Sequence, residues 1–117
     1  MKFLVIDQDR GAMQRLGLAC LERGTGVLIA ENVSEGVRAL LREIVSLIVV
    51  DVALLRLTPR EHLMLFERVA PGVPVVLVVG PDSSLDSRVS LELAGFRVLT
   101  RPVSAEDLLE KLELLTR

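Results

Sequence analysis

The sequence predicts an α/β fold in which helices cover both faces of a five-stranded parallel sheet. Three runs carry the prediction, because side chains that are apolar without alternation indicate strands buried on both faces. These runs are residues 3–6, residues 47–50 within the strand at 46–51, and residues 75–79. Helix-type patterns separate the strands, and this alternation requires parallel pairing with right-handed crossovers. We therefore predict a doubly wound, three-layer sandwich with strand order 2-1-3-4-5.

The N-terminal part of the chain is predicted as strand, helix and strand. Residues 3–6 form the first strand and residues 27–30 a second, shorter one. Between them Asp9 can cap a helix with apolar residues at helical spacing, and Gly24 follows near its end. Cys20 is the only cysteine and falls on the apolar stripe of this helix, so we expect a buried structural thiol.

The next helix and strand lead to a carboxylate. Asn32, with Glu35 three positions later, predicts the start of a helix that ends near Glu43. The strand at residues 46–51 ends in Asp51, and burying an ionised carboxylate inside a strand costs several kcal/mol. Asp51 is therefore predicted where the strand emerges, at the carboxyl edge of the sheet, where open α/β sheets bind ligands.

A connecting segment and a third helix follow this strand. Residues 52–57 are more aliphatic than a solvated loop needs, so we expect this segment to pack against or bind something. Thr58 and Glu61 have the spacing of a capping box, which predicts a helix running to about Val69. His62 has no second ligand at metal-binding spacing, so we expect a residue on the surface of this helix.

The C-terminal part completes the alternation. Residues 75–79 form a fully apolar strand, and Ser83 or Ser84 can cap the helix after it, which stops at Gly95. Residues 97–100 form a weaker strand that is typical of a sheet edge. Ser104 with Asp107 then predicts the last helix, which runs through Leu115.

Composition restricts the classes of function. The 117 residues form one domain, half of them are apolar, and the mean hydropathy is +0.48. The net charge of −2 with scattered basic residues, and the absence of Trp and Tyr, disfavour nucleic-acid binding. No apolar run has the length of a membrane span, and nothing at the N-terminus has the pattern of a signal peptide. We expect a cytoplasmic protein that binds other proteins and neither membranes nor nucleic acid.

Acidic residues are predicted to converge at one point. In the order 2-1-3-4-5 the first and third strands are neighbours, so Asp7 and Asp51 meet at the carboxyl edge. Two such carboxylates repel each other unless a cation or a proton intervenes. Carboxylates, a backbone carbonyl and water suit Mg²⁺, which commonly works beside a phosphate. For Asp9 a simple helix cap is the preferred interpretation.

With these motifs in this order, the whole chain, residues 1–117, resembles the receiver domains of bacterial two-component response regulators. The resemblance implies a flavodoxin-like (βα)5 fold and a role in phosphorelay signal transduction. It implies that Asp51 accepts a phosphoryl group from a histidine kinase or a small donor. It also implies that Mg²⁺ is bound by Asp7, Gln8, Asp51 and the carbonyl of Ala53. In addition, it implies that the peptide bond between Arg101 and Pro102 is cis. The motifs that carry the resemblance are residues 3–7, 47–51, 74–80, 94–95 and 100–102.

The chain departs from the family pattern at several positions that this resemblance makes functional. Gln8 replaces a second acid, so Mg²⁺ is expected to bind weakly. Val79 stands at the switch position and Val98 at the position of an aromatic reporter, which removes the usual readout. Arg101 replaces a lysine; it keeps the positive charge that stabilises the phosphoryl group and can bind it bidentately, with a different geometry.

Three hypotheses about function follow. The favoured one is an atypical receiver-like binding module with weak or no phosphorylation switching. The second is a working Mg²⁺-dependent phospho-acceptor in which Asp51 is modified. The third is a phosphatase of the haloacid-dehalogenase type using Asp7 and Asp9, because Asp-x-Asp is also the pattern of that family. The first two describe no turnover enzyme, since at most one phosphoryl group is accepted.

A surplus of apolar residues supports the binding module. Leu54, Leu57 and the run at residues 63–66 are more apolar than wet surfaces need. The resemblance places output contacts on the last two helices and the strand between them. The partner is a histidine kinase or an output protein, and a homodimer is also considered. The residues expected on this partner surface are Leu85, Val89, Val98 and Leu114.

Overall fold

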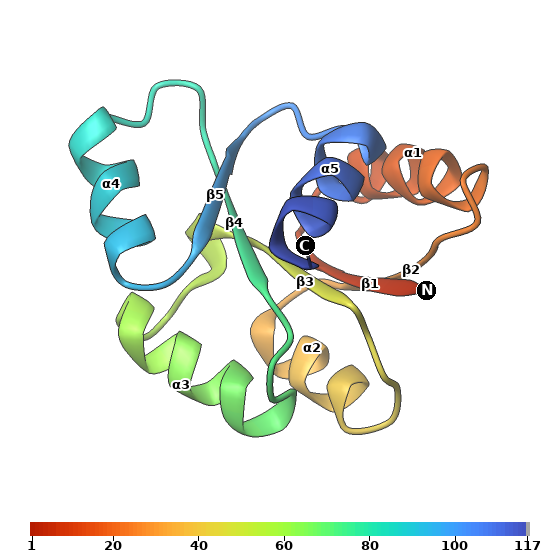
Figure 1. The fold of residues 1–117 in the computed structure, drawn as a ribbon, viewed down its shortest axis with the longest axis horizontal. Coiled ribbons are helices and arrows are strands. Elements are labelled where there is room, and N and C mark those ends of the chain that lie inside the picture. The colour runs from red at the N-terminus through yellow and green to blue at the C-terminus, as the bar shows by residue number, and fades with distance from the viewer. Residues whose placement is uncertain (117) are drawn as a thin grey trace.

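The computed structural model describes residues 1–116. All strands are parallel and pair in the order β2-β1-β3-β4-β5, as predicted (Figure 1). In chain order the elements are β1 (Lys2–Ile6), α1 (Arg10–Leu21), β2 (Gly26–Ala30), α2 (Val33–Leu40), β3 (Leu47–Asp51), the 3-10 turn η1 (Val52–Leu54), α3 (Pro59–Val69), β4 (Val75–Val79), α4 (Leu85–Leu93), β5 (Arg97–Thr100) and α5 (Ala105–Thr116).

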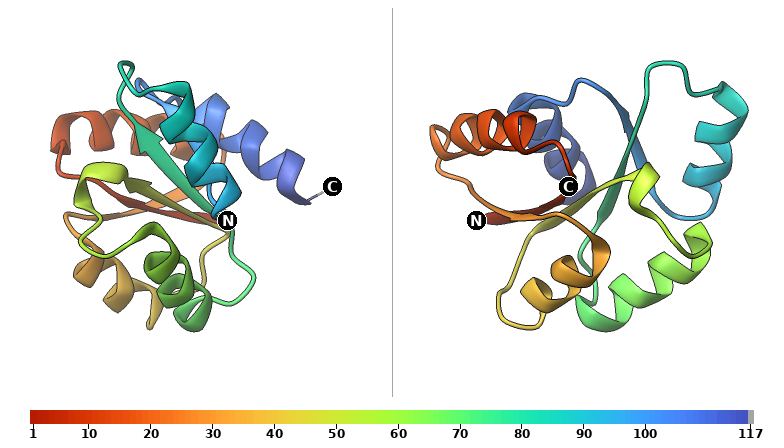
Figure 2. Two further views of the ribbon diagram at one scale, coloured as in Figure 1. Left: turned by 90° about the vertical axis from the view of Figure 1, so that its left-hand side faces the viewer. Right: turned by 180° about the vertical axis from the view of Figure 1, so that it is seen from behind.

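The sheet lies between two layers of helices. Helices α1 and α5 cover one face, and α2, α3 and α4 cover the other (Figure 2). The apolar strands β1, β3 and β4 occupy the interior of the sheet, whereas β2 and β5 form its edges. Burial follows this order, since every residue of β4 is buried and none of β5 is. The uniform apolar runs therefore marked the central strands correctly.

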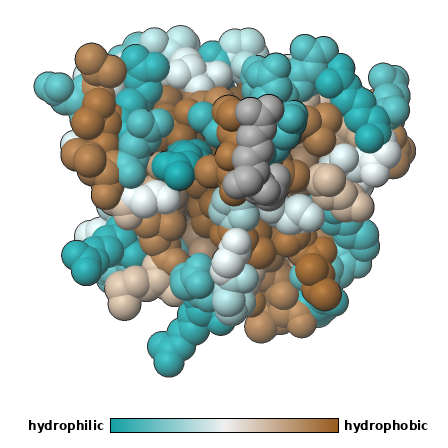
Figure 3. Space-filling model, viewed as in Figure 1, coloured by the Kyte–Doolittle hydropathy of each residue, from teal (hydrophilic) through white to brown (hydrophobic). Residues whose placement is uncertain are grey.

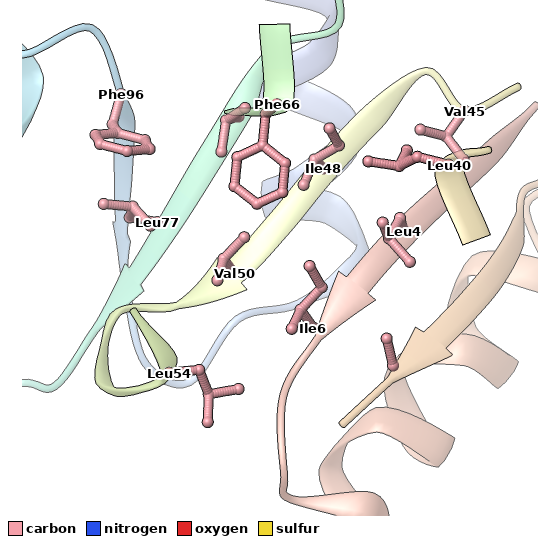
Figure 4. Packing of buried hydrophobic residues seen from close by; sticks show 12 residues of the cluster. Leu4, Ile6, Leu40, Val45, Ile48, Val50, Leu54, Phe66, Leu77 and Phe96 are labelled. Carbon is pink, nitrogen blue, oxygen red and sulfur yellow. The ribbon is translucent and has the colours of Figure 1, made fainter. Parts of the chain in front are cut away.

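Each face of the sheet has its own apolar core, because side chains of a strand alternate between faces. On the face of α1 and α5, Val5 and Val49 pack with Met13 and Leu108. On the other face, side chains from β1 and β3 pack against α2 and α3 (Figure 4). The residues labelled there include Leu4, Ile6, Leu40, Ile48, Val50 and Phe66.

Side-chain caps begin the helices where the sequence predicts them. Asp9 accepts a hydrogen bond from the N–H of Ala12, and Thr58 with Glu61 forms a complete capping box. Ser84, rather than Ser83, caps α4. One boundary differs, because α2 ends at Leu40 instead of near Glu43 and continues only as hydrogen-bonded turns.

Two expectations about exposure were wrong. His62 is 1% exposed, because it shares the inner stripe of α3 with Phe66, four residues later, and its Nδ1 lies 3.2 Å from the carbonyl oxygen of Thr58. Leu54 is not surplus either: η1 folds it into the core beneath α3, and Leu55 packs there too. The aliphatic content of residues 52–57 is thus partly core, whereas Leu57 is exposed.

Cys20 is fully buried in the core under α1, as expected. Burial raises the pKa of its thiol, and the charge of Arg23 opposes this only in part. The side chain therefore behaves as a small apolar group. Among residues 1–116, no helix has the length and apolarity required to cross a membrane.

Close packing of α2 on β1 gives a test of this core. A Cβ on Gly36 would lie 2.4 Å from Cδ1 and 3.0 Å from Cγ1 of the buried Ile6. Gly36→Ala is expected to lower the free energy of unfolding by about 1 kcal/mol, because overpacking outweighs the gain in helix propensity. Gly17→Ala is the control, since its Cβ would meet only Val27 at 3.8 Å. Urea denaturation should show the control to be equal to or more stable than the wild type; a stabilised Gly36→Ala variant would contradict this packing.

Candidate functional site

Three charged side chains converge at the carboxyl edge of the sheet. Asp51 is the last residue of β3, and Asp7 follows the neighbouring strand β1. Arg101 follows β5, and its backbone N–H donates to the carbonyl oxygen of Val79 at 3.0 Å. The bond between Arg101 and Pro102 is cis, as the resemblance implied. The parallel topology thus assembles the site from segments far apart in the chain.

Arg101 pairs with both carboxylates. Its Nη2 lies 2.5 Å from Oδ2 of Asp51 and 3.9 Å from Oδ2 of Asp7. The acids are largely buried, with side chains 14% and 18% exposed. The hydrogen bond to Asp51 raises the pKa of Arg101, and partial burial opposes this only in part. One guanidinium therefore offsets part of the charge of two carboxylates that would otherwise repel each other.

Backbone donors orient the carboxylates. The N–H of Asp9 donates to Oδ1 of Asp7 at 2.9 Å, and the N–H of Ala53 donates to Oδ1 of Asp51 at 3.0 Å. The Oδ2 atom of each acid is the one that Arg101 approaches. Local turns after β1 and β3 therefore aim one oxygen of each acid at the same point.

The donor set fits a hard divalent cation by its chemistry, although Arg101 competes for the same oxygens. Asp7, Asp51 and the carbonyl of Ala53 are the oxygen groups that would hold such an ion. Gln8 is exposed, and its side chain makes no hydrogen bond within residues 1–116. No cluster of three or more His, Cys, Asp or Glu side chains suited to a metal occurs in that range. A cation here has two carboxylates at most.

The chain is similar in sequence and in fold to known proteins of one family. The chain is 33% identical over 113 residues to the transcriptional regulatory protein GlrR of Escherichia coli (strain K12), which covers 94% of this chain and 25% of that protein. It is 28% identical to a CheY-like response regulator receiver domain from Methanospirillum hungatei JF-1, with a TM-score of 0.79 and coverage of 98% and 93%. The chain is a receiver domain of the response regulators. No family model matches it.

The length of GlrR and a solved structure with the same fold add to this comparison. A response regulator from Burkholderia pseudomallei, solved with a phosphorylated aspartic acid, a calcium ion and citrate, shares the fold of this receiver domain. Its sequence is 23% identical, the TM-score is 0.79, and the match covers 95% of this chain and 65% of that one. The receiver domain spans about a quarter of the length of GlrR.

Val79 and Val98, which the resemblance placed at the switch and reporter positions, lie on the α4 side of this receiver domain. Val79 is 1% exposed at the end of β4 and lies two residues after Leu77, so its side chain is on the same face of the sheet as Leu77, which packs in the core under α2 and α3. Val98 is half-buried on the edge strand β5. Neither side chain has a hydrogen-bonding atom. The site therefore has polar side chains toward α1 and α5, and valine toward α4.

Asp9 does not join the pair of acids. Its carboxylate caps α1, and the residue is exposed. The arrangement of Asp7 and Asp9 thus gives no support to the phosphatase hypothesis. The preferred interpretation of Asp9 as a helix cap is confirmed.

Two features beside the site were missed in the sequence. A cavity of about 480 Å³ lies between α1 and α5; Asp7 and Arg101 are among its lining residues, and Val5 and Val49 contribute apolar walls. No sequence pattern signals such a gap, because it depends on how two distant helices seat on the sheet. Arg88 was also missed, although its position three residues before the core-facing Leu91 places it on the inner stripe of α4.

The expected partner surface forms an apolar stripe along α4. Leu85, Val89 and Leu93 follow at four-residue spacing and are 67%, 43% and 83% exposed. Apolar side chains gather over this helix at the left of the molecule in Figure 3. Leu114 on α5 is 62% exposed, whereas Val98 is half-buried. The stripe on α4 is the more continuous part of that surface.

Proposed function

We propose that this receiver domain takes part in phosphorelay signalling and accepts a phosphoryl group on Asp51. The observation that carries the proposal is the convergence of Asp7, Asp51 and Arg101 at the carboxyl edge of the sheet. Phosphoryl transfer depends mainly on positioning and on stabilisation of negative charge, so few groups are needed. The donor is a histidine kinase or a small acyl phosphate. The phosphorylated aspartic acid of the B. pseudomallei regulator supports this role for the fold.

In the proposed transfer, Oδ2 of Asp51 attacks the phosphorus atom. The bond from phosphorus to the donor nitrogen or oxygen breaks, and the leaving group keeps its electron pair. Arg101 must release Oδ2 before the attack, and its planar guanidinium then binds two phosphoryl oxygens. The N–H of Ala53 holds Oδ1 throughout and keeps the carboxylate oriented.

We further propose that Mg²⁺ binds weakly at Asp7, Asp51 and the carbonyl of Ala53. Gln8 contributes no charge there, and Arg101 already occupies the Oδ2 side of both acids. When bound, a divalent cation supplies charge neutralisation for the phosphoryl oxygens. The calcium ion in the B. pseudomallei regulator supports divalent metal binding by the fold.

Intact-mass spectrometry tests the proposed function. The protein is incubated with acetyl phosphate, with Mg²⁺ or with a chelator. We expect the mass of one phosphoryl group to appear with Mg²⁺ and to form more slowly with the chelator. A chain that stays unmodified at all Mg²⁺ concentrations would contradict the proposal.

A second candidate function is a protein-interaction module that works without phosphorylation. It is favoured by the pairing of Arg101 with Asp51, which offsets the charge of the acceptor without a metal. In this case a partner binds with equal affinity to the wild type and to Asp51→Asn. The same mass experiment separates the two candidates.

For either candidate we propose that α4 provides a protein contact, with a second copy as one occupant. Val89→Asp places a charge at the centre of the apolar stripe and is expected to weaken self-association at least tenfold. The control is Leu41→Asp, because Leu41 is 72% exposed just after α2. Analytical ultracentrifugation of the three proteins measures the effect. Equal self-association of Val89→Asp and the wild type would exclude α4 as the contact between two copies.

A further inference from the structure

Arg88 is a half-buried cation without an acidic partner. It lies in the second turn of α4 and faces the sheet. Its Nη1 donates to Oγ1 of Thr100 at 3.4 Å, which is a long hydrogen bond. Its Nε is buried and has no hydrogen-bond partner. No carboxylate among residues 1–116 pairs with it.

The hydrogen-bonding groups of Arg88 are therefore only partly satisfied within the chain. A buried N–H without an acceptor is destabilising, and hydrogen bonds to charged groups are stronger than neutral ones. The guanidinium also presents donors in a fixed fork that matches the oxygens of a phosphoryl group or a carboxylate. Arg88 therefore has the properties of an anion-binding group whose anion is not part of the resting chain.

The position of Arg88 in the fold indicates which anion it can bind. Thr100 pairs with Val79, and Asp51 pairs with Val78 on the same strand β4. The Cα atoms of Thr100 and Asp51 are thus separated by two strand spacings, about 10 Å in all. The guanidinium of Arg88 lies at the Thr100 end of that gap, on the side of the sheet opposite to Arg101.

Nothing else fills the α4 side of the acceptor with a polar side chain from β4. Val79 has no hydrogen-bonding atom, and Gly80 has no side chain beyond its Cα. A phosphoryl group on Asp51 has three oxygens, and Arg101 approaches from the α1 and α5 side. The oxygens on the other side face the part of the sheet edge where Arg88 and the hydroxyl of Thr100 lie, and Arg88 would reach them by moving past Gly80.

We propose that Arg88 binds the phosphoryl group of Asp51 from the α4 side and so couples phosphorylation to the position of α4. The inference rests on the proposed phosphorylation of Asp51. Release of the long contact to Thr100 frees the guanidinium, and a charge-assisted hydrogen bond replaces it. Helix α4 moves with Arg88 because it is held on the sheet by few contacts: it has no buried residue, and Leu91 packs against the core while only partly buried. The apolar stripe on its outer face moves as well.

The test uses NMR spectra of the whole chain with Mg²⁺ and acetyl phosphate, with the phosphorylated fraction of each sample measured by intact mass. The variants are Arg88→Gln, which removes the charge, and Arg88→Lys, which keeps it. Arg97→Gln, an exposed arginine on β5, is the matched control. In the wild type we expect the amide signals of residues 84–93 and the Nε–H signal of Arg88 to shift with the phosphorylated fraction.

In Arg88→Gln we expect the signal shifts of α4 to be at least twofold smaller than in the wild type at an equal phosphorylated fraction. Arg88→Lys should recover part of these shifts. Arg97→Gln should show the same shifts as the wild type. Unchanged α4 shifts in Arg88→Gln at equal phosphorylation would overturn the role of Arg88 and leave the proposed function intact. A wild type that accepts no phosphoryl group would overturn both. Shifts that follow protein concentration instead of phosphorylation would mean that Arg88 binds a carboxylate of a second copy, which also overturns the proposal.

Discussion

Asp51→Asn is expected to abolish the gain of a phosphoryl group from acetyl phosphate. The amide cannot act as the attacking carboxylate, and it no longer attracts Arg101 by charge. The fold should survive, because the amide oxygen of the variant side chain can still accept from the N–H of Ala53. Intact-mass spectrometry over a time course gives the modified fraction, which should fall to background.

The control for this variant is Asp9→Asn. Asp9 lies beside the site but caps α1, and asparagine caps helices as well as aspartate does. This control should be modified to at least half the extent of the wild type. If Asp51→Asn gains the same mass as the wild type, the acceptor is a different residue.

Arg101→Met is expected to raise the affinity for Mg²⁺ about tenfold or more, equivalent to at least ~1.4 kcal/mol. Arg101 is the cation that approaches Oδ2 of both acids, so its removal frees these oxygens and increases the net negative charge. Without metal, the variant should lose about 1–2 kcal/mol of stability. This is less than for a fully buried pair, because Arg101 is 38% exposed.

Isothermal titration calorimetry measures the affinity, and urea denaturation with and without Mg²⁺ measures the stability. Mg²⁺ should restore most of the stability lost in Arg101→Met. Arg97→Met, on the exposed edge strand, is the matched control and should bind Mg²⁺ like the wild type. An unchanged affinity in Arg101→Met would show that Arg101 does not compete with the metal.

The fold could be predicted from the sequence almost completely, because local patterns and global topology agree. Uniform apolar runs marked β1, β3 and β4, and Thr58 with Glu61 marked the start of α3. The end of α2 was less predictable. Residues after Leu40 continue as hydrogen-bonded turns, and no glycine or proline marks the boundary.

The site was predictable to the extent that topology dictates it. Parallel pairing of β1 and β3 places Asp7 beside Asp51 in any sheet of this order. The contact distances of Arg101 were not predictable, since they depend on the path of the chain after β5. The prediction that His62 is exposed failed for a related reason. The polarity of His62 indicated a surface residue, but it lies on the same buried stripe of α3 as Phe66.

Arg88 shows the limit of reading polarity without packing. A charged residue on a helix is normally assigned to solvent, and an apolar stripe such as that of α4 is normally assigned to the inner face. In the structure Leu85, Val89 and Leu93 face outward, in agreement with the expected place of Leu85 and Val89 on the partner surface, while Arg88 faces β5. The edge strand β5 is too weakly apolar to demand an apolar partner.

The location of the phosphoryl group tests directly whether Asp51 is the acceptor. Phosphorylated protein is reduced with borohydride, which converts an aspartyl phosphate to homoserine, and peptides are then sequenced by tandem mass spectrometry. We predict homoserine at position 51 and unchanged aspartate at Asp7 and Asp9. Homoserine at either of those positions, or unreduced Asp51 in protein that carries the added mass, would contradict it.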